Sequence, residues 1–345
     1  MLMYHGTLFT PDRSLKAYNS FGIDVRARLY ASFNSMEALL EMLEHYNELP
    51  YMPLLILGGG SNILFTRDVD GLVLKNDLKG FELIDEDKDY FYVKAMAGEN
   101  WHEFVMYCIE NGYAGLENLS LIPGSVGASP MQNIGAYGVE IKDVFHSLEA
   151  WHINEKHKEI FYLKDCEFGY RESVFKEKYR NRFIITSVTY RLRKNPEFHT
   201  SYGAINLELE KMQVKELSIK AISDAVIRIR QSKLPDPTQL GNAGSFFKNP
   251  IISINRFKTL EEKFPHIVGH NVSEQKVKIA AAWLIEQCGW KGFRKGDVGC
   301  HEKQPLVLVN YGNATGADIF KLSTDIMQSV FEKFGIHLER EVNIV

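Results

Sequence analysis

The sequence predicts an α+β fold organised in two or three domains, and three observations support this prediction. The chain has 345 residues, which at about 150 residues per domain corresponds to between two and three domains. Hydrophobic residues make up 45% and charged residues 24% of the chain, and these ordinary globular values exclude a fibrous or disordered protein. Segments with the two-residue period of strands are interspersed with segments that have the period of helices.

The first 80 residues are predicted to form a small β-α-β-β unit. Residues 22–30 alternate apolar and polar side chains, which is the period of a strand with one buried face. Asn34 and Glu37 have the spacing of a capping box and predict a short helix after them. Two apolar runs, at 53–57 and 71–74, predict the remaining strands.

Residues 81–234 are predicted to form a second mixed unit. Strands are expected at 90–97, 147–153, 159–163 and 182–192, and helices at 100–111 and 217–233. The basic stretch that begins at Tyr170 is also predicted to be helical. The segment Leu234-Pro235-Asp236-Pro237 ends the last helix, because proline disfavours helical backbone in the residue before it. This break is the predicted domain boundary.

The region beyond the boundary contains two predicted helices and two predicted strands. Helical spacing of apolar residues predicts an amphipathic helix over 273–288, and a strand at 305–310 and a helix at 315–334 follow. The last residues alternate apolar and polar side chains, so a terminal strand at 336–344 would place Glu339 and Glu341 on one face. Such acids usually form a solvent-facing edge, but one could act as a general acid if that face lined a cleft.

Charge and motif content exclude several classes of function. Lys and Arg number 40 against 44 Asp and Glu, so no global positive field favours a nucleic-acid partner. The four cysteines form no C-x-x-C pair, and His266 and His270 lack the glutamate of an H-E-x-x-H motif, so neither disulfides nor a metal is predicted. No long apolar run and no secretion-signal pattern occurs. We therefore expect no membrane association and a cytoplasmic location.

Three glycine-rich segments are candidates for ligand binding, although none has a P-loop or a G-x-G-x-x-G motif. Gly58-Gly59-Gly60-Ser61-Asn62 follows an apolar strand and offers backbone N–H groups to a pyrophosphate, although alone it is as often a plain turn. The segment 123–128 shares this property, and 132–138 adds amide and aromatic groups suited to a planar polar ring. Together they predict a flat, phosphate-bearing ligand.

Ser245 and Arg171 have ordinary interpretations when taken alone. Ser245 lies between glycines and aromatic residues in 241–250, where a capping serine in a turn is the simplest interpretation. No G-x-S-x-G motif is present, so a hydrolase nucleophile is not indicated. Arg171, by itself, is more typical of a surface ion pair than of a catalytic cation.

Seven segments, taken in order, resemble one protein family. They are SFGIDVRA (20–27), LGGGSNIL (57–64), PGSVGASPMQNIGAYG (123–138), YRESVFK (170–176), KLPDP (233–237), GNAGSFFKNP (241–250) and LEREV (338–342). The family is UDP-N-acetylenolpyruvoylglucosamine reductase. Its members are the FAD enzymes that catalyse the second committed step in bacterial peptidoglycan precursor synthesis. The resemblance covers nearly the whole chain, and seven motifs in the same order are far more specific than any one of them.

The resemblance implies a particular arrangement of domains. The FAD-binding fold of the vanillyl-alcohol oxidase type has two α+β subdomains that sandwich FAD, and a C-terminal α+β domain binds the substrate. On this chain the first subdomain is expected at 1–80 and the second at 81–234, completed by the C-terminal strand 336–345. The UDP-sugar substrate domain is expected at 235–335.

The resemblance also implies residues that bind the cofactor. It assigns non-covalent FAD to the three glycine-rich segments. The residues are Gly58, Gly59, Gly60, Ser61, Asn62, Pro123, Gly124, Ser125, Gly127, Ala128, Asn133, Ile134, Gly135, Ala136 and Tyr137.

Three catalytic residues are implied in the same way. Ser245 corresponds to the family's proton-donating serine, Arg171 to its arginine and Glu341 to its glutamate. The family often has L-E-P-E-V-R at the C-terminal motif, where this chain has Arg340 and Asn343, so Glu339 competes with Glu341 for the acidic role.

Four further residues are implied for the substrate. Tyr202 resembles the tyrosine of a mobile loop that closes over the substrate in one family subtype, and Lys233, Asn249 and Gln304 fall near positions that contact UDP. The implied partners are NADPH and UDP-N-acetylglucosamine enolpyruvate, with UDP-N-acetylmuramate as product and the chain as a monomer.

The implied reaction gives each catalytic residue type a task. NADPH reduces the flavin, and the enolpyruvyl ether then receives the hydride at its terminal carbon. Arg171 and Glu341 would counter the negative charge that develops on the carboxylate-stabilised enolate, and Ser245 would protonate the adjacent carbon.

Two rival functions remain open at this point. A flavin oxidase of the same fold would often tether FAD through a histidine near the pyrophosphate loop, and no histidine occurs between His102 and His146. A catalytically silent flavin or UDP-sugar sensor would keep the glycine segments and lose Ser245, Arg171 or Glu341, all of which are present.

Overall fold

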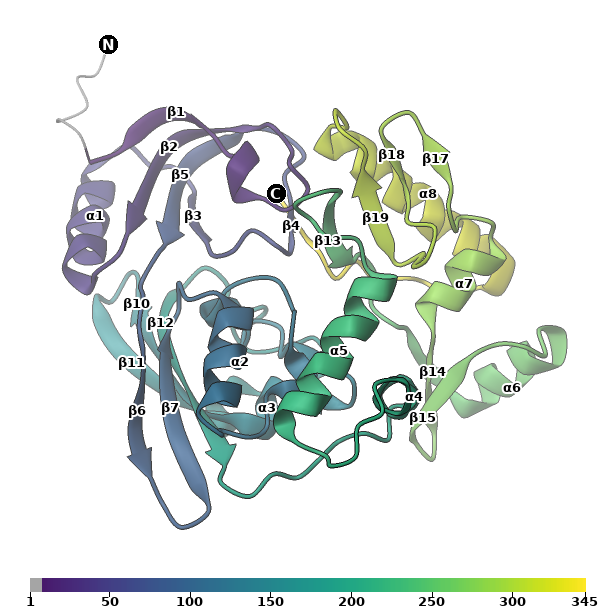
Figure 1. The fold of residues 1–345 in the computed structure, drawn as a ribbon. Coiled ribbons are helices and arrows are strands. Elements are labelled where there is room, and N and C mark those ends of the chain that lie inside the picture. The colour runs from purple at the N-terminus through teal and green to yellow at the C-terminus, as the bar shows by residue number, and fades with distance from the viewer. Residues whose placement is uncertain (1–7) are drawn as a thin grey trace. The chain divides into compact units, whose positions relative to one another are not determined.

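Helices and strands are interspersed along the chain in the computed structural model, which describes residues 8–345 (Figure 1). The predicted mixture of both element types is therefore confirmed. In those residues no helix combines the length with the apolar character that crossing a membrane requires.

The first sheet is largely parallel and forms the predicted β-α-β-β unit. Its strands, in spatial order, are β1 (Thr10–Ser14), β2 (Arg26–Phe33), β5 (Val69–Asn76) and β3 (Leu54–Leu57). Helix α1 (Met36–Glu48) connects β2 to β3 and buries Leu39 and Leu43 against the sheet. The cap is Ser35 and not Asn34, because the Ser35 hydroxyl accepts the Ala38 N–H at 3.1 Å.

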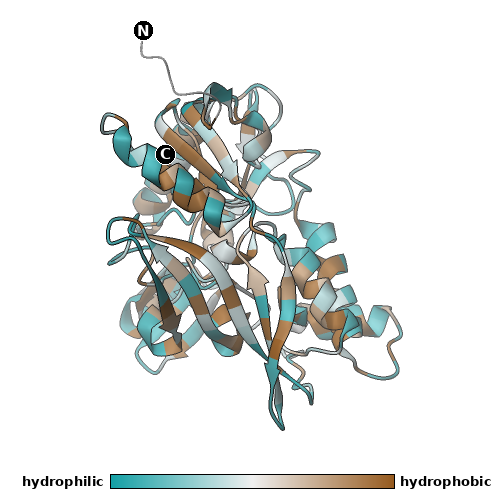
Figure 2. Cartoon of the chain, turned by 90° about the vertical axis from the view of Figure 1, so that its left-hand side faces the viewer, coloured by the Kyte–Doolittle hydropathy of each residue, from teal (hydrophilic) through white to brown (hydrophobic). Residues whose placement is uncertain are grey.

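The second sheet is antiparallel and has five strands in the order β11-β10-β12-β7-β6. The strands are β6 (Phe81–Glu86), β7 (Tyr90–Met96), β10 (Phe145–His152), β11 (His157–Tyr162) and β12 (Phe183–Arg193). Buried residues alternate with less buried ones over the second half of β10, and strands of mixed hydrophobic and hydrophilic colour are visible in Figure 2. Helix α2 (Trp101–Glu110) begins after the capping residue Asn100, and its apolar side chains join the core formed with β7 and β12.

Two further helices and several short elements lie outside these two sheets. Helices α4 (Gly203–Lys211) and α5 (Ile219–Lys233) share a small core that includes Ile205, Val226 and Ile229. The short elements are η1 (Lys16–Tyr18), η2 (Glu117–Leu119), η3 (Val126–Ala128), β8 (Gly135–Ala136), β9 (Val139–Glu140), α3 (Ile141–Val144) and η4 (Leu163–Cys166).

The C-terminal part contains three small sheets and three helices. One sheet has β13 (Gly241–Ser245), β19 (Val307–Asn310), β18 (Val298–Cys300) and β17 (Arg294–Lys295), and another has β14 (Ile251–Ser253), β16 (Lys276–Ile279) and β15 (Gly269–Ser273). The helices are α6 (Ile254–Lys263), α7 (Ala281–Gln287) and α8 (Gly316–Phe334). Strand β20 (Asn343–Ile344) pairs in parallel with β4 (Ile63–Leu64).

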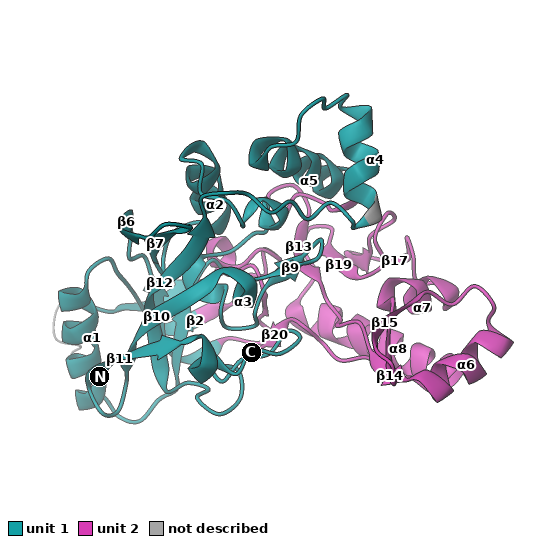
Figure 3. Ribbon diagram, turned by 90° about the horizontal axis from the view of Figure 1, so that it is seen from below, with its two compact units in different colours: residues 1–13, 27–59, 69–232 teal, residues 14–26, 60–68, 233–345 magenta. Residues whose placement is uncertain are grey.

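The chain divides into two compact units (Figure 3). Unit 1 comprises residues 1–13, 27–59 and 69–232, and unit 2 comprises residues 14–26, 60–68 and 233–345. The start of unit 2's long segment at Lys233 lies beside the predicted boundary at Pro235. Strand β20 joins β4 within unit 2, and not the five-stranded sheet of the predicted 81–234 subdomain that it was expected to complete.

The amphipathic helix predicted over 273–288 is wrong in its first half. Residues 276–279 form strand β16, in which Val277 and Ile279 are buried, whereas Lys276 and Lys278 are not. The alternation of this short run is the period of a strand, and β-branched side chains suit a strand better than a helix. Helix α7 begins only at Ala281, so the helical spacing of Val277 with Ala281 was a coincidence.

The helix predicted from Tyr170 is also wrong. Residues 170–180 form consecutive turns, and Arg171 has a left-handed backbone with φ of 57°. The backbone hydrogen bonds are those of turns, because the Lys176 N–H donates to the Ser173 carbonyl and the Tyr179 N–H to the Val174 carbonyl, and neither bond has the four-residue spacing of an α-helix.

Candidate active site

Two of the glycine-rich turns meet within unit 1. Gly58 and Gly59 follow strand β3, and a Cβ atom on Gly59 would lie 2.8 Å from the Cα atom of Gly124. A Cβ atom on Gly58 would lie 2.6 Å from the hydroxyl oxygen of Ser125. Glycine at position 59 allows this close approach of two backbones, and glycine-rich turns of this kind are suited to bind a pyrophosphate.

Gly59→Ala is therefore expected to separate the two turns. The added methyl group would press on backbone, so we expect a loss of about 1–3 kcal/mol in the free energy of unfolding together with loss of bound FAD. Urea unfolding and the flavin absorbance of the purified protein measure the two effects. Gly112→Ala is the control, because a Cβ atom there meets nothing within 4 Å and changes only a left-handed backbone far from the turns. Equal flavin content in both variants would contradict the prediction.

The second turn is anchored on the start of helix α2. The N–H of Gly127 donates to the Ala97 carbonyl at 2.9 Å, and the N–H of Val126 donates to the Glu99 carbonyl at 2.9 Å. The Trp101 N–H donates to the Gly124 carbonyl at 3.0 Å. A Cβ atom on Gly127 would lie 2.6 Å from that of Ala97, so this glycine too is required by a close approach.

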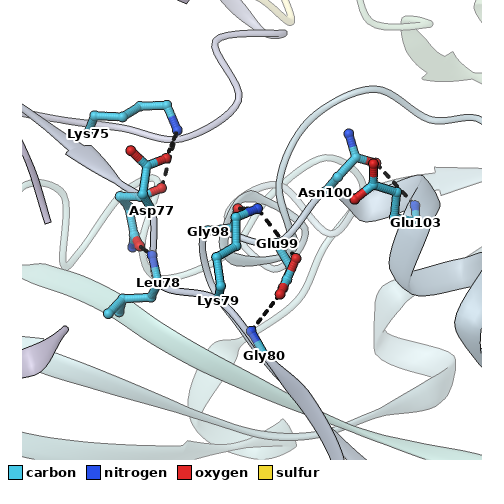
Figure 4. Close-up of polar contacts among 10 residues, drawn as sticks. Lys75, Asp77, Leu78, Lys79, Gly80, Gly98, Glu99, Asn100 and Glu103 are labelled. Atoms are coloured by element: carbon cyan, nitrogen blue, oxygen red, sulfur yellow. Dashed lines mark hydrogen bonds and ion pairs between the residues drawn. The ribbon is translucent and has the colours of Figure 1, made fainter. Parts of the chain in front are cut away.

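The buried carboxylate of Glu99 holds the chain just before helix α2. Figure 4 shows the Glu99 carboxylate directed at the backbone nitrogen of Gly80, from which it accepts a hydrogen bond at 2.5 Å. Lys79 donates to the Gly98 carbonyl at 2.7 Å and lies 3.4 Å from the other Glu99 oxygen. Glu99 is only 8% exposed, and the partners at both oxygens offset the cost of burying its charge.

Asn133, a predicted cofactor residue, has an internal structural role. It is buried with φ of 45°, and its amide nitrogen donates to Glu140 at 3.1 Å and to the Gly169 carbonyl at 3.0 Å. Its amide oxygen accepts the Lys142 N–H at 3.0 Å. The side chain of Asn133 therefore sets the path of the third glycine-rich segment.

Arg171 lies against this same segment. Its guanidinium donates to the Gly135 carbonyl at 2.7 Å. A Cβ atom on Gly135 would lie 3.1 Å from that guanidinium and 2.8 Å from Glu140, so a larger residue would displace the arginine. The structure thus brings a predicted catalytic cation to a predicted flavin-binding segment within unit 1.

Tyr137 and Tyr202 are also in contact. Their ring centroids are 5.6 Å apart at an interplanar angle of 85°, an edge-to-face pair. Tyr137 has φ of 50°, and burial raises its pKa, with Tyr202 adding to the rise and Arg230 opposing it. Tyr202 precedes helix α4 and is 55% exposed. The predicted substrate loop therefore touches a predicted flavin-binding segment.

Ser245 and Glu341 are neighbours within unit 2. Ser245 ends strand β13 and pairs with Val307 of β19. The N–H of Glu341 donates to the carbonyl of Phe246, the residue after Ser245, at 2.8 Å. Asn62 donates from its amide to the Glu341 carbonyl at 3.3 Å, so the end of the first glycine-rich segment helps to place Glu341.

The competing acid, Glu339, has a different environment. Its carboxylate lies 2.6 Å from the ammonium of Lys248 and its side chain is 68% exposed, whereas that of Lys248 is 8% exposed. The N–H of Lys248 also donates to the Glu339 carbonyl at 2.9 Å. This pairing gives Glu339 a structural task as the counterion of a buried lysine.

The other predicted residues of unit 2 occupy element ends. Gly60 has φ of 64°, and a Cβ atom there would lie 2.0 Å from the Tyr18 carbonyl oxygen. Asn249 accepts the Ala281 N–H at 2.9 Å and so caps helix α7. The Gln304 carbonyl accepts the Val307 N–H at 3.0 Å, which joins its turn to the sheet that carries Ser245. Lys233 is exposed at the end of α5.

Two residues beside the second glycine-rich turn escaped the sequence prediction. His102 accepts the N–H of Leu121 at 3.0 Å, and Arg230 donates to the carbonyl of Leu121 at 3.1 Å. Burial lowers the pKa of His102, and the charge of Arg230 lowers it further. For Arg230 the sequence did contain a signal. It follows Val226 by four residues, so this charged residue falls on the apolar side of helix α5.

Comparison with known proteins identifies both parts of the chain. Residues 27–158 match the model of an FAD binding domain, and residues 236–345 match the model of the UDP-N-acetylenolpyruvoylglucosamine reductase C-terminal domain. The UDP-N-acetylenolpyruvylglucosamine reductase of Thermus caldophilus has the same fold, with a TM-score of 0.68 at 22% identity over 98% of this chain and 99% of that one. The predicted fold class and the predicted FAD cofactor are thereby confirmed.

Sequence similarity to curated relatives extends over the full length. The UDP-N-acetylenolpyruvoylglucosamine reductase of Flavobacterium johnsoniae is 53% identical over 96% of this chain and 98% of its own length. The reductase of Amoebophilus asiaticus is 52% identical over 96% of this chain and 97% of its own length. The chain therefore belongs to the UDP-N-acetylenolpyruvoylglucosamine reductase family.

Proposed function

We propose that this chain is an FAD-dependent oxidoreductase that reduces UDP-N-acetylglucosamine enolpyruvate to UDP-N-acetylmuramate with NADPH, in the synthesis of peptidoglycan precursors for the cell wall. One observation carries the proposal, which is 53% identity to a reductase of this name over 96% of the chain. The contact of the Gly58–Gly59 and Gly124–Ser125 turns inside the FAD binding domain agrees with it.

The residues of unit 1 fit the cofactor. The two turns that meet without Cβ atoms would hold its pyrophosphate, and the segment from Asn133 to Tyr137 would lie against its ring system. FAD, when bound, accepts hydride from NADPH and supplies it to the enolpyruvyl carbon. The chain's own contribution is to position the reactants and to handle charge and protons.

Arg171 and Glu341 are proposed to stabilise the charge that develops on the substrate. Hydride addition places negative charge on a carboxylate-stabilised enolate, which a guanidinium and a protonated carboxyl group can both counter. The Arg171 guanidinium is oriented in advance by its bond to the Gly135 carbonyl. A preorganised donor of this kind contributes about 2.7–4 kcal/mol to transition-state stabilisation.

Ser245 is proposed to donate the proton to the adjacent carbon. A developing carbanion is basic enough to take a proton from a neutral hydroxyl, and general acids contribute typically about 10²–10⁴-fold to the rate. Backbone pairing of β13 with β19 and of Phe246 with Glu341 holds this serine on a sheet and not on a loose loop.

Lys233, Asn249 and Gln304 are proposed to bind the UDP part of the substrate, and Tyr202 to close over the substrate on its loop. Tyr202 is exposed at the start of α4, as a residue that closes over a ligand must be. We also propose FAD-binding subdomains at 1–80 and 81–234, a substrate domain at 235–335, a cytoplasmic location and a monomer. Light scattering coupled to gel filtration measures the oligomeric state.

Two matched variants test which of Glu341 and Glu339 is the catalytic acid. Glu341→Gln is expected to lower kcat about 10²-fold, because an amide N–H is a far weaker acid than a carboxyl O–H and so makes a weaker hydrogen bond to the developing enolate, while reduction of the flavin by NADPH continues. Glu339→Gln is expected to keep turnover and to lower stability through the lost partner of Lys248. Steady-state kinetics and thermal unfolding of both variants distinguish them, and the opposite pattern would transfer the role to Glu339.

An absorption spectrum of the purified protein tests the proposed function as a whole. Under anaerobic conditions we expect a flavin spectrum that bleaches with NADPH and returns when the enolpyruvyl sugar is added. Recovery with air but not with the sugar would indicate an oxidase. A colourless protein that cannot be reconstituted with FAD would remove the flavoenzyme assignment.

A further inference from the structure

Leu121 has an unusual backbone just before the second glycine-rich turn. Its φ is 58°, in the left-handed region that residues with a Cβ atom rarely adopt. It lies three residues before Gly124, after the short helical turn η2. Since the chain must pass through this strained residue to enter the turn, something has to stabilise it there.

Two side chains from separate helices hold both backbone groups of Leu121. Its N–H donates to the Nδ1 atom of His102, in the first turn of α2, at 3.0 Å. Its carbonyl accepts from the Nε atom of Arg230, near the end of α5, at 3.1 Å. The lowered pKa of His102 agrees with an unprotonated Nδ1 atom that can accept this bond.

This arrangement leads directly to the proposed pyrophosphate site. Gly124 and Ser125 follow Leu121 and contact Gly59 and Gly58 at distances that leave no room for a Cβ atom. A change in the backbone direction at Leu121 would therefore move Gly124 and Ser125 relative to Gly59 and Gly58.

Arg230 extends the arrangement to the substrate loop. Its positive charge also opposes the rise in the pKa of Tyr137 that burial causes, and the Tyr137 ring lies edge to face against Tyr202. The same guanidinium that bonds Leu121 thus acts on the segment that carries Tyr137.

We propose that His102 and Arg230 are positioning residues for the flavin, which act by holding Leu121 in its left-handed conformation and so fix the turn that carries Gly124 and Ser125. The inference rests on the proposed function, because it requires that this turn binds FAD. Neither residue is proposed to take part in the chemistry.

The test measures the dissociation constant of FAD from apoprotein by fluorescence quenching, a readout that does not depend on turnover. His102→Leu removes the acceptor and is expected to weaken FAD binding about tenfold, since leaving a partly buried N–H without its acceptor is costly. His102→Asn is the matched control, because its side-chain oxygen can accept the same N–H. We expect this variant to bind FAD within about threefold of the wild type.

Substitutions at Leu121 test whether backbone strain at this residue is the reason that His102→Leu weakens FAD binding. Glycine adopts positive φ readily, so Leu121→Gly is expected to restore much of the FAD affinity lost in His102→Leu. Leu121→Val is expected to weaken FAD binding without leaving a polar group unpaired, because β-branched residues resist this backbone conformation. It remains informative even when His102→Leu fails to fold. Arg230→Met should weaken FAD binding in the same direction as His102→Leu.

The outcomes separate the inference from the function on which it rests. Wild-type apoprotein that does not bind FAD would overturn the proposed function. Wild-type binding with unchanged affinity in folded His102→Leu and Leu121→Val would overturn only the positioning role. The double variant His102→Leu with Leu121→Gly gives a further outcome. If it binds FAD no better than His102→Leu alone, then His102 and Arg230 do not act by offsetting strain at Leu121.

Discussion

Ser245→Ala is expected to retain FAD and its reduction by NADPH while losing turnover with the enolpyruvyl sugar by about 10²–10⁴-fold. The substitution removes the hydroxyl proposed to protonate the substrate and leaves the backbone pairing of β13 with Val307 intact. Anaerobic stopped-flow absorbance separates the two half-reactions, so the loss should appear only after the sugar is added.

Ser253→Ala is the matched control for this variant. Ser253 belongs to the same unit and its hydroxyl caps helix α6 by accepting the Arg256 N–H at 3.3 Å. Its removal is expected to cost about 1 kcal/mol of stability and to leave kcat unchanged. If Ser245→Ala oxidised NADPH in the presence of the sugar at the wild-type rate, another group would have to be the proton donor.

Arg171→Met is expected to lower kcat by about 10²–10³-fold, because a preorganised cation is lost where substrate charge develops. Arg171→Lys should recover only part of this loss, since an ammonium group keeps the charge but lacks the planar fork that reaches the Gly135 carbonyl. Steady-state kinetics with saturating NADPH measure both variants, and flavin absorbance verifies that FAD is still bound.

Arg180→Met provides the comparison at an exposed arginine of the same turn-rich segment. We expect wild-type kcat from this variant, because surface charges at such positions contribute little. Arg171→Met with normal kcat would mean that the bond to Gly135 is a purely structural feature of the loop.

Elements with strong local signals were predicted well from the sequence. Helix α8 begins at the capping box of Thr315 with Asp318 and ends at Gly335 with φ of 62°, as the patterns indicate. Helix α2 begins after Asn100 for the same reason. Caps and periodic burial involve residues within one or two turns of each other, so a short stretch of sequence contains the whole cause.

Local signals failed where the neighbours in space decided the conformation. At Val277 and Ile279 the local signals conflicted, since alternation favours a strand and the spacing to Ala281 favours a helix, and pairing with β14 and β15 decided for the strand. In the turns after Tyr170, Phe175 and Tyr179 contact Phe161, which lies outside that stretch of sequence. Helical spacing and basic composition do not contain this information.

For the site, the sequence by itself determined which residue types are available and, through family resemblance, which of them are candidates for catalysis. Only the tertiary structure decided that Gly59 touches Gly124, that Glu339 is the partner of Lys248, and that Arg230 reaches Leu121. These pairs join segments far apart in the chain. Their contacts depend on how sheets and helices pack, and packing leaves no periodic pattern in either segment.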